Sequence, residues 1–394
     1  MKKNIYLSAP GLICCAGQNR DALYESCLNG YQGGMVMRNF SGNGQFPVGL
    51  ISGEMPDAAF QNTRIIRMMS TALEQIRPDI EKALSAYGPE KIGVCLGSCD
   101  NGSEASLTAH QALLANGAFP EDYDLWYQSA AYPAEWIART FGLAGPVFSV
   151  ATACASGASA IMRGAQLIQA GICSAVIAGG ADIVSQTVMA GFHALEALSD
   201  SLCNPFSKNR KGINLGEGAA FFLLDTAECS AITLAGVGES AYAYHMTAPG
   251  TDGAGPVKAM KAALLDAGLK PEAVEYVNLH GTGTVLNDKA EALAMRAVFS
   301  TPPPASSTKP ITGHTLGAAG ALEAAICWMA LNEQKGLPLH CWDGEHDDEL
   351  VFQPDDRTLG ARTLGARTSG TPFSIGMSNS FAFGGCNVSL IFER

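Results

Sequence analysis

The sequence predicts an α/β protein with largely buried sheets. Short runs rich in β-branched residues alternate with longer helical patterns, as expected when helices cover the faces of a sheet. Hydrophobic residues make up 47% of the 394 residues and charged residues only 16%, so the chain can bury a large core and is not intrinsically disordered. The length fits about two to three units of ~150 residues, or one large intertwined core.

The expected elements follow one another along the whole chain. Strand-like runs cover residues 5–9, 91–98, 147–153, 175–180, 219–225, 232–238, 275–280, 373–379 and 387–392. Helical patterns cover residues 158–170, 256–267, 288–299 and 317–331. Many positions in these helices are Gly, Ala or Ser, which suits close packing between layers. A tandem repeat, RTLGA at 357–361 and again at 362–366, fits no solenoid period and is expected in an exposed loop.

The N-terminus leaves a weak signal peptide as an alternative to a first strand. Lys2 and Lys3 precede a short apolar run, but Pro10 and Gly11 break that run early, so a strand is the preferred interpretation. The longest uncharged stretch, 164–181, contains four glycines and reads as part of a helix, a turn and a strand. We therefore expect no membrane span and a cytoplasmic protein.

Charge and cysteine content exclude further classes. The formal net charge of −12 argues against nonspecific binding of nucleic acid or of an anionic membrane. The 12 cysteines are scattered without a CxxC pair or zinc-site spacing. Reduced thiols in a cytosol, most of them buried, are the expected state.

Cys154 has the most distinctive setting of these cysteines. It ends an extended apolar run in VATACASGASA, and a small-residue helix follows at once, with Gly157 permitting a tight turn. A thiol there faces the positive end of the helix dipole and free backbone N–H groups, which we expect to lower its pKa. This is the geometry of a nucleophile elbow. A packed core cysteine is the alternative.

Two of the seven histidines strengthen the catalytic interpretation. His280 ends a strand-like run in NLHGTGT, and His314 lies in STKPITGHTLGAAG at a Gly-rich entry into a helix. Active sites of α/β folds collect in such strand-end loops, although one histidine there would usually be structural. Lys309 precedes His314, and the predicted helix would turn Glu323 toward the same place. A metal site from Cys154 and the two histidines is disfavoured, because no acid or cysteine near them has ligand spacing.

Together these motifs resemble the β-ketoacyl-acyl carrier protein synthases, the condensing enzymes of the thiolase superfamily. The resemblance covers essentially the whole chain, in the family's order. It rests on TACASG around Cys154, AGGAD at Ala178–Asp182, HGTGT at 280–284, TKPITGHTLGAAG at 308–320 and SNSFAFGG at 378–385. It implies a thiolase-like five-layered αβαβα fold of two similar halves, which we divide at 1–230 and 231–394.

The resemblance also implies the roles of the central residues. Cys154 matches the acylated nucleophile, and His280 and His314 match the two catalytic histidines. Lys309 matches the lysine that organises the second histidine, and Glu323 matches the supporting acid. The implied reaction is a decarboxylative Claisen condensation with malonyl-acyl carrier protein. It uses no metal and no cofactor of its own, since the substrates arrive on the carrier's phosphopantetheine arm.

Further residues are implied to bind the arm and to gate the site. Thr282 and Thr284 match the threonines that bind phosphopantetheine. Phe383 matches the gating phenylalanine, whose backbone N–H joins that of Cys154 in the oxyanion hole. Ala382 replaces the first glycine of the family's usual SFGFGG loop, and Cys386 replaces a threonine, so the gating loop is expected to be stiffer or differently posed.

These departures, together with a short segment at 202–220, resemble the condensing enzymes of aryl-polyene-type pathways. That subgroup implies a polyunsaturated acyl chain and either a homodimer or a heterodimer with a chain-length-factor subunit. The carrier is expected to be acidic, and the candidate docking residues are Arg64, Arg67, Lys208, Arg210 and Lys211. Solvated surface charges are the alternative interpretation of these residues.

Three other functions stay open at this stage. A non-catalytic chain-length factor is disfavoured, since such subunits characteristically lack the nucleophile that Cys154 provides. Another thiolase-fold acyltransferase is disfavoured by HGTGT and by the glycine before His314. A cysteine hydrolase would not need the second histidine.

Overall fold

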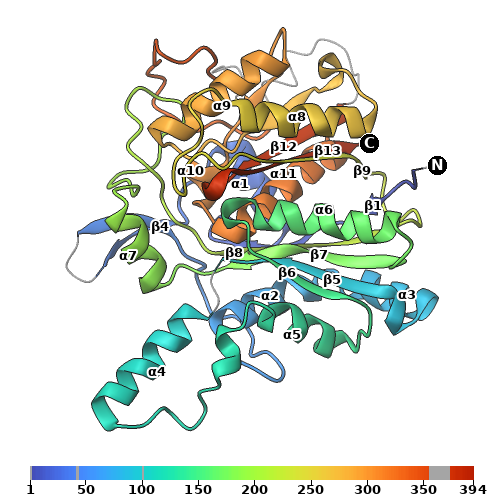
Figure 1. Ribbon diagram of the computed structural model, residues 1–394, viewed down its shortest axis with the longest axis vertical. Helices are drawn as coiled ribbons and strands as arrows, with labels where there is room; N and C mark the ends of the chain where they lie inside the picture. The colour runs from blue at the N-terminus through green and yellow to red at the C-terminus, as the bar shows by residue number, and fades with distance from the viewer. Residues whose placement is uncertain (1, 41–43, 100–101, 355–372) are drawn as a thin grey trace.

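The computed structural model describes residues 2–40, 44–99, 102–354 and 373–394, and the RTLGA repeat lies outside them. Five layers alternate between helices and sheet (Figure 1). One outer layer is formed by α8 (Ala254–Ala267) and α9 (Val285–Val298), the middle layer by α6 (Ser156–Gln169) and α11 (Ala319–Glu333), and the other outer layer by α2 (Arg64–Glu74), α3 (Arg77–Tyr87) and α5 (Tyr132–Phe141). The expected α/β class and layered fold are confirmed.

The strands form one long path that changes character at its centre. Its order is β11 (Ala305–Ser306), β10 (Tyr276–Asn278), β12 (Ile375–Phe381), β13 (Cys386–Glu393), β9 (Thr233–Ala241), β1 (Tyr6–Leu7), β8 (Gly218–Asp225), β7 (Ala175–Asp182), β5 (Ile92–Gly97) and β6 (Val147–Val150). Strand β2 (Gly11–Cys14) pairs with β8 off this path, and β3 (Met35–Asn39) with β4 (Gln45–Gly49) forms a separate hairpin. Among the described strands, only the short β1 joins the two ends of the path. Each end can therefore be treated as a sheet of its own.

The two ends repeat one pairing pattern. Strand β5 pairs in parallel with β6 and β7, and β7 pairs antiparallel with β8. Likewise β10 pairs in parallel with β11 and β12, and β12 pairs antiparallel with β13. Helix α6 follows β6 in the first set, and α11 follows β11 in the second. The two central helices are therefore topological equivalents.

Close packing of the central helices brings their N-termini together. A Cβ at Gly157 would lie 2.8 Å from the Gly317 carbonyl oxygen, and one at Gly320 would lie 2.8 Å from Ala158 Cβ. Only glycine allows this approach, as the small residues of both patterns suggested. Helix α11 is buried along most of its length, so both sheets and α6 hold it in place. Residues at the starts of α6 and α11 thus share one site.

Several elements lie outside the sequence patterns. The sequence patterns did not include α2, α3 and α5, nor α1 (Arg20–Asn29), α4 (Ser103–Asn116), α7 (Gln186–Ala194) and α10 (Lys309–Thr312). Helix α4 projects from the body at the lower left of Figure 1; Ala109 is buried in it, whereas Leu114 is exposed. Among the described helices, none has the length and apolar character needed to cross a bilayer.

Candidate active site

Cys154 lies in a strained elbow between β6 and α6. The predicted strand stops at Val150, because Ala153 adopts φ +48°, a left-handed conformation that costs an alanine roughly 1–2 kcal/mol. This turn directs Cys154 into the interior at the start of α6, where the residue is 6% exposed. Strain held by surrounding packing is typical of functional sites.

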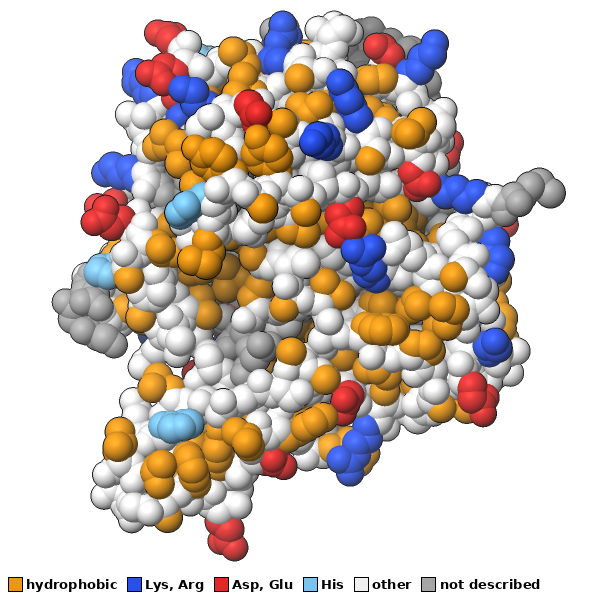
Figure 2. Space-filling view, viewed as in Figure 1, with side chains coloured by type: hydrophobic (Ala, Val, Ile, Leu, Met, Phe, Trp, Pro, Cys, Tyr) orange, Lys and Arg blue, Asp and Glu red, His pale blue; other side chains and the backbone are white. Residues whose placement is uncertain are grey.

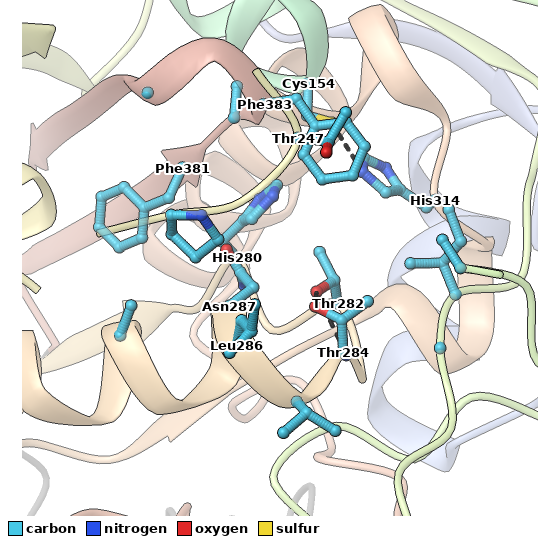
Figure 3. Close-up of a pocket in the computed structure, with 18 of the residues that line it drawn as sticks. Cys154, Thr247, His280, Thr282, Thr284, Leu286, Asn287, His314, Phe381 and Phe383 are labelled. Atoms are coloured by element: carbon cyan, nitrogen blue, oxygen red, sulfur yellow. Dashed lines mark hydrogen bonds between the residues drawn. The ribbon is translucent and has the colours of Figure 1, made fainter. Parts of the chain in front are cut away.

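Two histidines from the other half of the chain meet this thiol. His314 Nε2 lies 3.0 Å from Cys154 Sγ, and the rings of His280 and His314 meet edge to face with centroids 5.5 Å apart. The three side chains converge in a pocket of about 300 Å³ (Figure 3). The sequence placed these residues on separate loops, and the structure brings all three together.

Hydrogen bonds define which ring nitrogen of each histidine carries the proton. The Leu316 backbone N–H donates to His314 Nδ1 at 3.3 Å, which leaves the proton on Nε2, the atom facing the thiol. The Lys309 ammonium lies 3.4 Å from His280 Nδ1, so this nitrogen also acts as an acceptor. Both imidazoles therefore present an Nε2–H donor.

Both imidazoles are neutral at pH 7. Burial lowers the pKa of His280 well below 6.5, and the charge of Lys309 and the neighbouring His314 lower it further. Burial and Lys309 likewise lower the pKa of His314 well below 6.5. Neutral Nε2–H groups can stabilise a developing negative charge without first losing or gaining a proton.

Lys309 is placed differently from what the resemblance implied. Its ammonium donates to the His280 carbonyl oxygen and pairs with Glu323, and it lies beside His280 Nδ1. The lysine thus orients the first histidine directly, whereas a backbone N–H orients the second. Burial raises the pKa of Glu323 to about 7, which the Lys309 charge opposes. The buried pair is held by packing on every side.

The expected lowering of the Cys154 pKa is wrong. Burial raises the pKa of this thiol to about 11, although Lys309 and the backbone N–H groups of Phe383 and Cys154 act in the opposite direction. Desolvation outweighs the helix terminus here because Cys154 is only 6% exposed, so solvent stabilises a thiolate poorly at this position. The free protein therefore holds a protonated thiol at neutral pH.

The pocket mouth contains the residues expected to bind an arm and to gate the site. Thr282 and Thr284 both line the pocket, with their hydroxyl oxygens 2.9 Å apart (Figure 3). Phe383 stacks on Phe192 of α7 with ring centroids 5.9 Å apart. The expected stiffening by Ala382 has no basis in this conformation, because Ala382 is extended at φ −95°, which any residue adopts.

The sequence reasoning missed three buried carboxylates that hold the catalytic loops. Glu291 on α9 accepts the backbone N–H groups of His280 and Gly281, and Asp288 accepts those of Thr282 and Phe206. Asp182, at the end of β7, accepts the N–H groups of Cys99 and Gly317. Acids three residues apart just after a Gly-rich loop were an available signal for the first two, because that spacing places them on one face of a helix.

The five docking candidates occupy different environments. Arg210 is 8% exposed and pairs with Asp347 at 2.5 Å, and Arg64 forms two hydrogen bonds with the buried Glu217. Those two guanidinium groups are committed to internal partners and are not free for an incoming protein. Arg67 is half-buried, whereas Lys208 and Lys211 are exposed.

The ligand-type atoms of Cys154, His280 and His314 lie within 4.8 Å of one another. Such a set has the composition of a soft-metal site. The Lys309 ammonium beside His280 opposes a second cation there. The same three groups suit acyl chemistry better, since each already has an orienting partner for it.

Comparison with known proteins agrees with this geometry. The family model "Beta-ketoacyl synthase, N-terminal domain" matches residues 55–229, and "Beta-ketoacyl synthase, C-terminal domain" matches residues 227–340. The chain is 36% identical to Nodulation protein E of Rhizobium meliloti, covering 77% of this chain and 74% of that protein. It is 30% identical to 3-oxoacyl-[acyl-carrier-protein] synthase 2 of Staphylococcus aureus (strain COL), covering 84% and 82% respectively.

Solved structures give the same result. One similar chain comes from the ketosynthase ApeO in complex with its chain length factor ApeC from Xenorhabdus doucetiae, at 38% identity and a TM-score of 0.87, covering 99% of this chain and 98% of that one. Another is a beta-ketoacyl synthase from Burkholderia phymatum STM815, at 28% identity and a TM-score of 0.80, covering 100% and 99%.

Fold and similarity together define a thiolase-like condensing acyltransferase. The chain belongs to the β-ketoacyl synthase family, whose members elongate fatty-acid or polyketide chains. The family predicted from the sequence motifs is therefore confirmed.

Proposed function

We propose that Cys154 carries the growing acyl chain and that the site condenses it with malonyl-acyl carrier protein. The observation that carries this proposal is the 3.0 Å approach of His314 Nε2 to Cys154 Sγ, with His280 facing the same pocket. This arrangement supplies one nucleophile and two neutral hydrogen-bond donors. The reaction needs a nucleophile to hold the acyl chain and hydrogen-bond donors for the enolate.

The first step transfers the acyl group. Cys154 Sγ attacks the thioester carbonyl, the bond from that carbon to the carrier sulfur breaks, and the thiol proton leaves with the carrier sulfur. Because burial raises the pKa of this thiol to about 11, the proton must be lost as the sulfur attacks. The backbone N–H groups of Cys154 and Phe383 lie at the sulfur and are positioned to stabilise the tetrahedral oxyanion.

The second step decarboxylates the malonyl group. The bond between C2 and the carboxylate breaks, CO2 leaves, and the electron pair becomes an enolate. The Nε2–H groups of His280 and His314 point into the volume where that oxygen would lie. C2 then attacks the acyl carbonyl, the bond to Cys154 Sγ breaks, and the released thiolate takes a proton from solvent.

The pocket mouth suits the phosphopantetheine arm. Thr282 and Thr284 place two hydroxyl groups beside the path to Cys154, where they can bond the amides of the arm. Phe383 and its stacked partner Phe192 line the same pocket. Among the basic residues, we retain Arg67, Lys208 and Lys211 as the carrier-docking set.

We further propose an aryl-polyene-type pathway, with a polyunsaturated acyl chain and a homologous chain-length-factor partner. Ala382, Cys386 and the short 202–220 segment support this assignment, as does the likeness to the ApeO and ApeC complex. A homodimer is the alternative assembly. We place the protein in the cytoplasm and divide it into halves at 1–230 and 231–394.

Intact-protein mass spectrometry tests the function directly. Wild-type protein with acyl-carrier and malonyl-carrier substrates should gain an acyl adduct and then yield a carrier-bound β-ketoacyl product. Cys154→Ala should gain no adduct. An adduct that persists in Cys154→Ala would refute the nucleophile, release of free acid would indicate a hydrolase, and absence of any adduct in the wild type would indicate a non-catalytic subunit.

A further inference from the structure

An acidic segment covers part of the basic surface beside the pocket mouth. Residues 343–349 read DGEHDDE, and we refer to them as the acidic strap. The strap follows α11 and runs against residues 204–211, which contain three of the sequence-predicted docking residues. In Figure 1 it passes at the upper left near α9, and Figure 2 shows acidic and basic side chains interspersed there.

Two contacts anchor the strap to the body. Asp343 accepts hydrogen bonds from Ser207 Oγ and Asn209 Nδ2, both at 2.8 Å. Asp347 pairs with Arg210, whose side chain is only 5% exposed. Ser207 and Arg210 are both buried, so losing either anchor would take a hydrogen-bond partner from a buried polar group, and these contacts hold the strap in register.

Two other contacts are exposed ion pairs. Glu345 pairs with Lys208, and both side chains are about half exposed, at 52% and 53%. Glu349 lies 3.3 Å from Lys289, with exposures of 78% and 46%. Glu345 raises the pKa of Lys208, and Asp343 and Asp348 add to the effect. Exposed pairs of this kind contribute little to stability, so they exchange readily.

Both lysines lie next to residues that form the pocket. Lys208 precedes Lys211 on the same segment, and Lys289 follows Leu286 and Asn287 at the start of α9; those three neighbours all line the pocket. An arm that passes Thr282 and Thr284 on its way to Cys154 brings its carrier protein to this part of the surface. The two lysines are therefore placed to meet the carrier.

We propose that the acidic strap is a built-in electrostatic competitor of the acyl carrier protein. Glu345 and Glu349 occupy Lys208 and Lys289 in the free enzyme, and acidic side chains of the carrier replace them on docking. Asp343 and Asp347 keep the strap anchored throughout. The exchange makes docking weaker and more selective than two free lysines would allow. This inference rests on the proposed function, because it requires an acidic carrier.

The test compares carrier affinities of charge variants in the full-length protein. Glu345→Gln combined with Glu349→Gln should tighten binding of a holo acyl carrier protein by about three- to tenfold at low salt, measured by isothermal titration calorimetry. The gain should shrink as salt is raised, since both charge pairs are exposed. The gain should also vanish when Lys208→Gln and Lys289→Gln are added, because the strap acts through these lysines.

A matched control separates the strap from total charge. Glu90→Gln combined with Glu272→Gln changes the net charge equally at exposed positions in other parts of the chain. An equal gain in this control, or no gain in the strap variant, would overturn the proposal.

Acylation of Cys154 by octanoyl-N-acetylcysteamine needs no carrier and checks the site itself. If that acylation proceeds but the wild type binds no carrier at any salt, the carrier assignment fails and the strap proposal fails with it. If acylation is absent, the nucleophile assignment fails instead.

Discussion

The chain forms a similar strained elbow before α6 and before α11, and the two elbows serve different purposes. Each follows the outermost strand of its sheet, and each contains a non-glycine residue in the left-handed region, Ala153 at φ +48° and Leu316 at φ +50°. The next residue is Cys154 in the first elbow and Gly317 in the second. Where the first elbow presents a thiol, the Gly317 backbone N–H of the second elbow donates a hydrogen bond to the Asp182 carboxylate.

This difference shows how one active site arises from two similar halves. The repeat built on β5 to β8 supplies the nucleophile, and the repeat built on β10 to β13 supplies His280, Lys309 and His314. A side chain at Gly317 would occupy the space that the other half needs, because a Cβ there would lie 2.6 Å from Asp182 Oδ2. Chemistry on one elbow therefore depends on the absence of a side chain on the other.

Replacing the catalytic histidines should have the largest effect, and it should affect the two reaction steps differently. His280→Ala and His314→Ala should each lower the condensation rate by about 10²–10³-fold, the typical cost of losing one donor to an oxyanion. Acylation of Cys154 should fall much less, because the nucleophile and the backbone N–H groups of Cys154 and Phe383 stay in place. Single-turnover mass spectrometry separates the two steps. His110→Ala, an exposed histidine on α4, is the control and should leave both steps unchanged.

The pH dependence of Cys154 alkylation tests whether burial or the helix terminus dominates the thiol pKa at the first elbow. Since the thiolate is the reactive form and burial raises the thiol pKa to about 11, the rate should rise roughly tenfold per pH unit between pH 7 and 10. Modification by iodoacetamide, followed by mass spectrometry, gives this profile. A plateau below pH 8 would show that the helix terminus outweighs burial after all.

A side chain on the second elbow should cost stability. Gly317→Ala forces its Cβ against Asp182 Oδ2 and against Ser98 Cα at 2.8 Å, so we expect a loss of about 1–3 kcal/mol in the free energy of unfolding. Urea denaturation measures it. Gly191→Ala on α7 is the matched control, since nothing lies within 4 Å of its Cβ, and it should not destabilise.

A substitution in the gating loop should have the smallest effect on stability and on the acylation rate. Ala382→Gly restores the family's usual loop, but Ala382 is already extended, so the change should lower stability by only about 0.5–1 kcal/mol through backbone entropy. The acylation rate should stay within about twofold of the wild type, since φ −95° strains neither residue. A large rise in this rate would show that Ala382 restrains a second conformation of the gate.

Sequence inferences that depend on local properties agree with the structure, whereas several inferences that depend on contacts between distant segments do not. Predicted strands such as 219–225 lie where expected, because periodicity and β-branching are local properties. The long strand predicted at 147–153 stops at Val150, since tertiary packing imposes the turn at Ala153. Arg210 appeared in sequence as one of several exposed charges, and only its partner Asp347, far along the chain, revealed that it is buried.

The sequence by itself determined the α/β class, the family and the identity of the residues that meet in the pocket. Motifs carry this information because residue types and short spacings can be read from the sequence without knowing which residues lie nearby in the fold. Only the tertiary structure decided the state of those residues: a protonated thiol, two neutral Nε2–H imidazoles, and a lysine that serves His280. The physical reason is that pKa and tautomer depend on burial and on hydrogen-bond partners, which come from segments far apart in the chain.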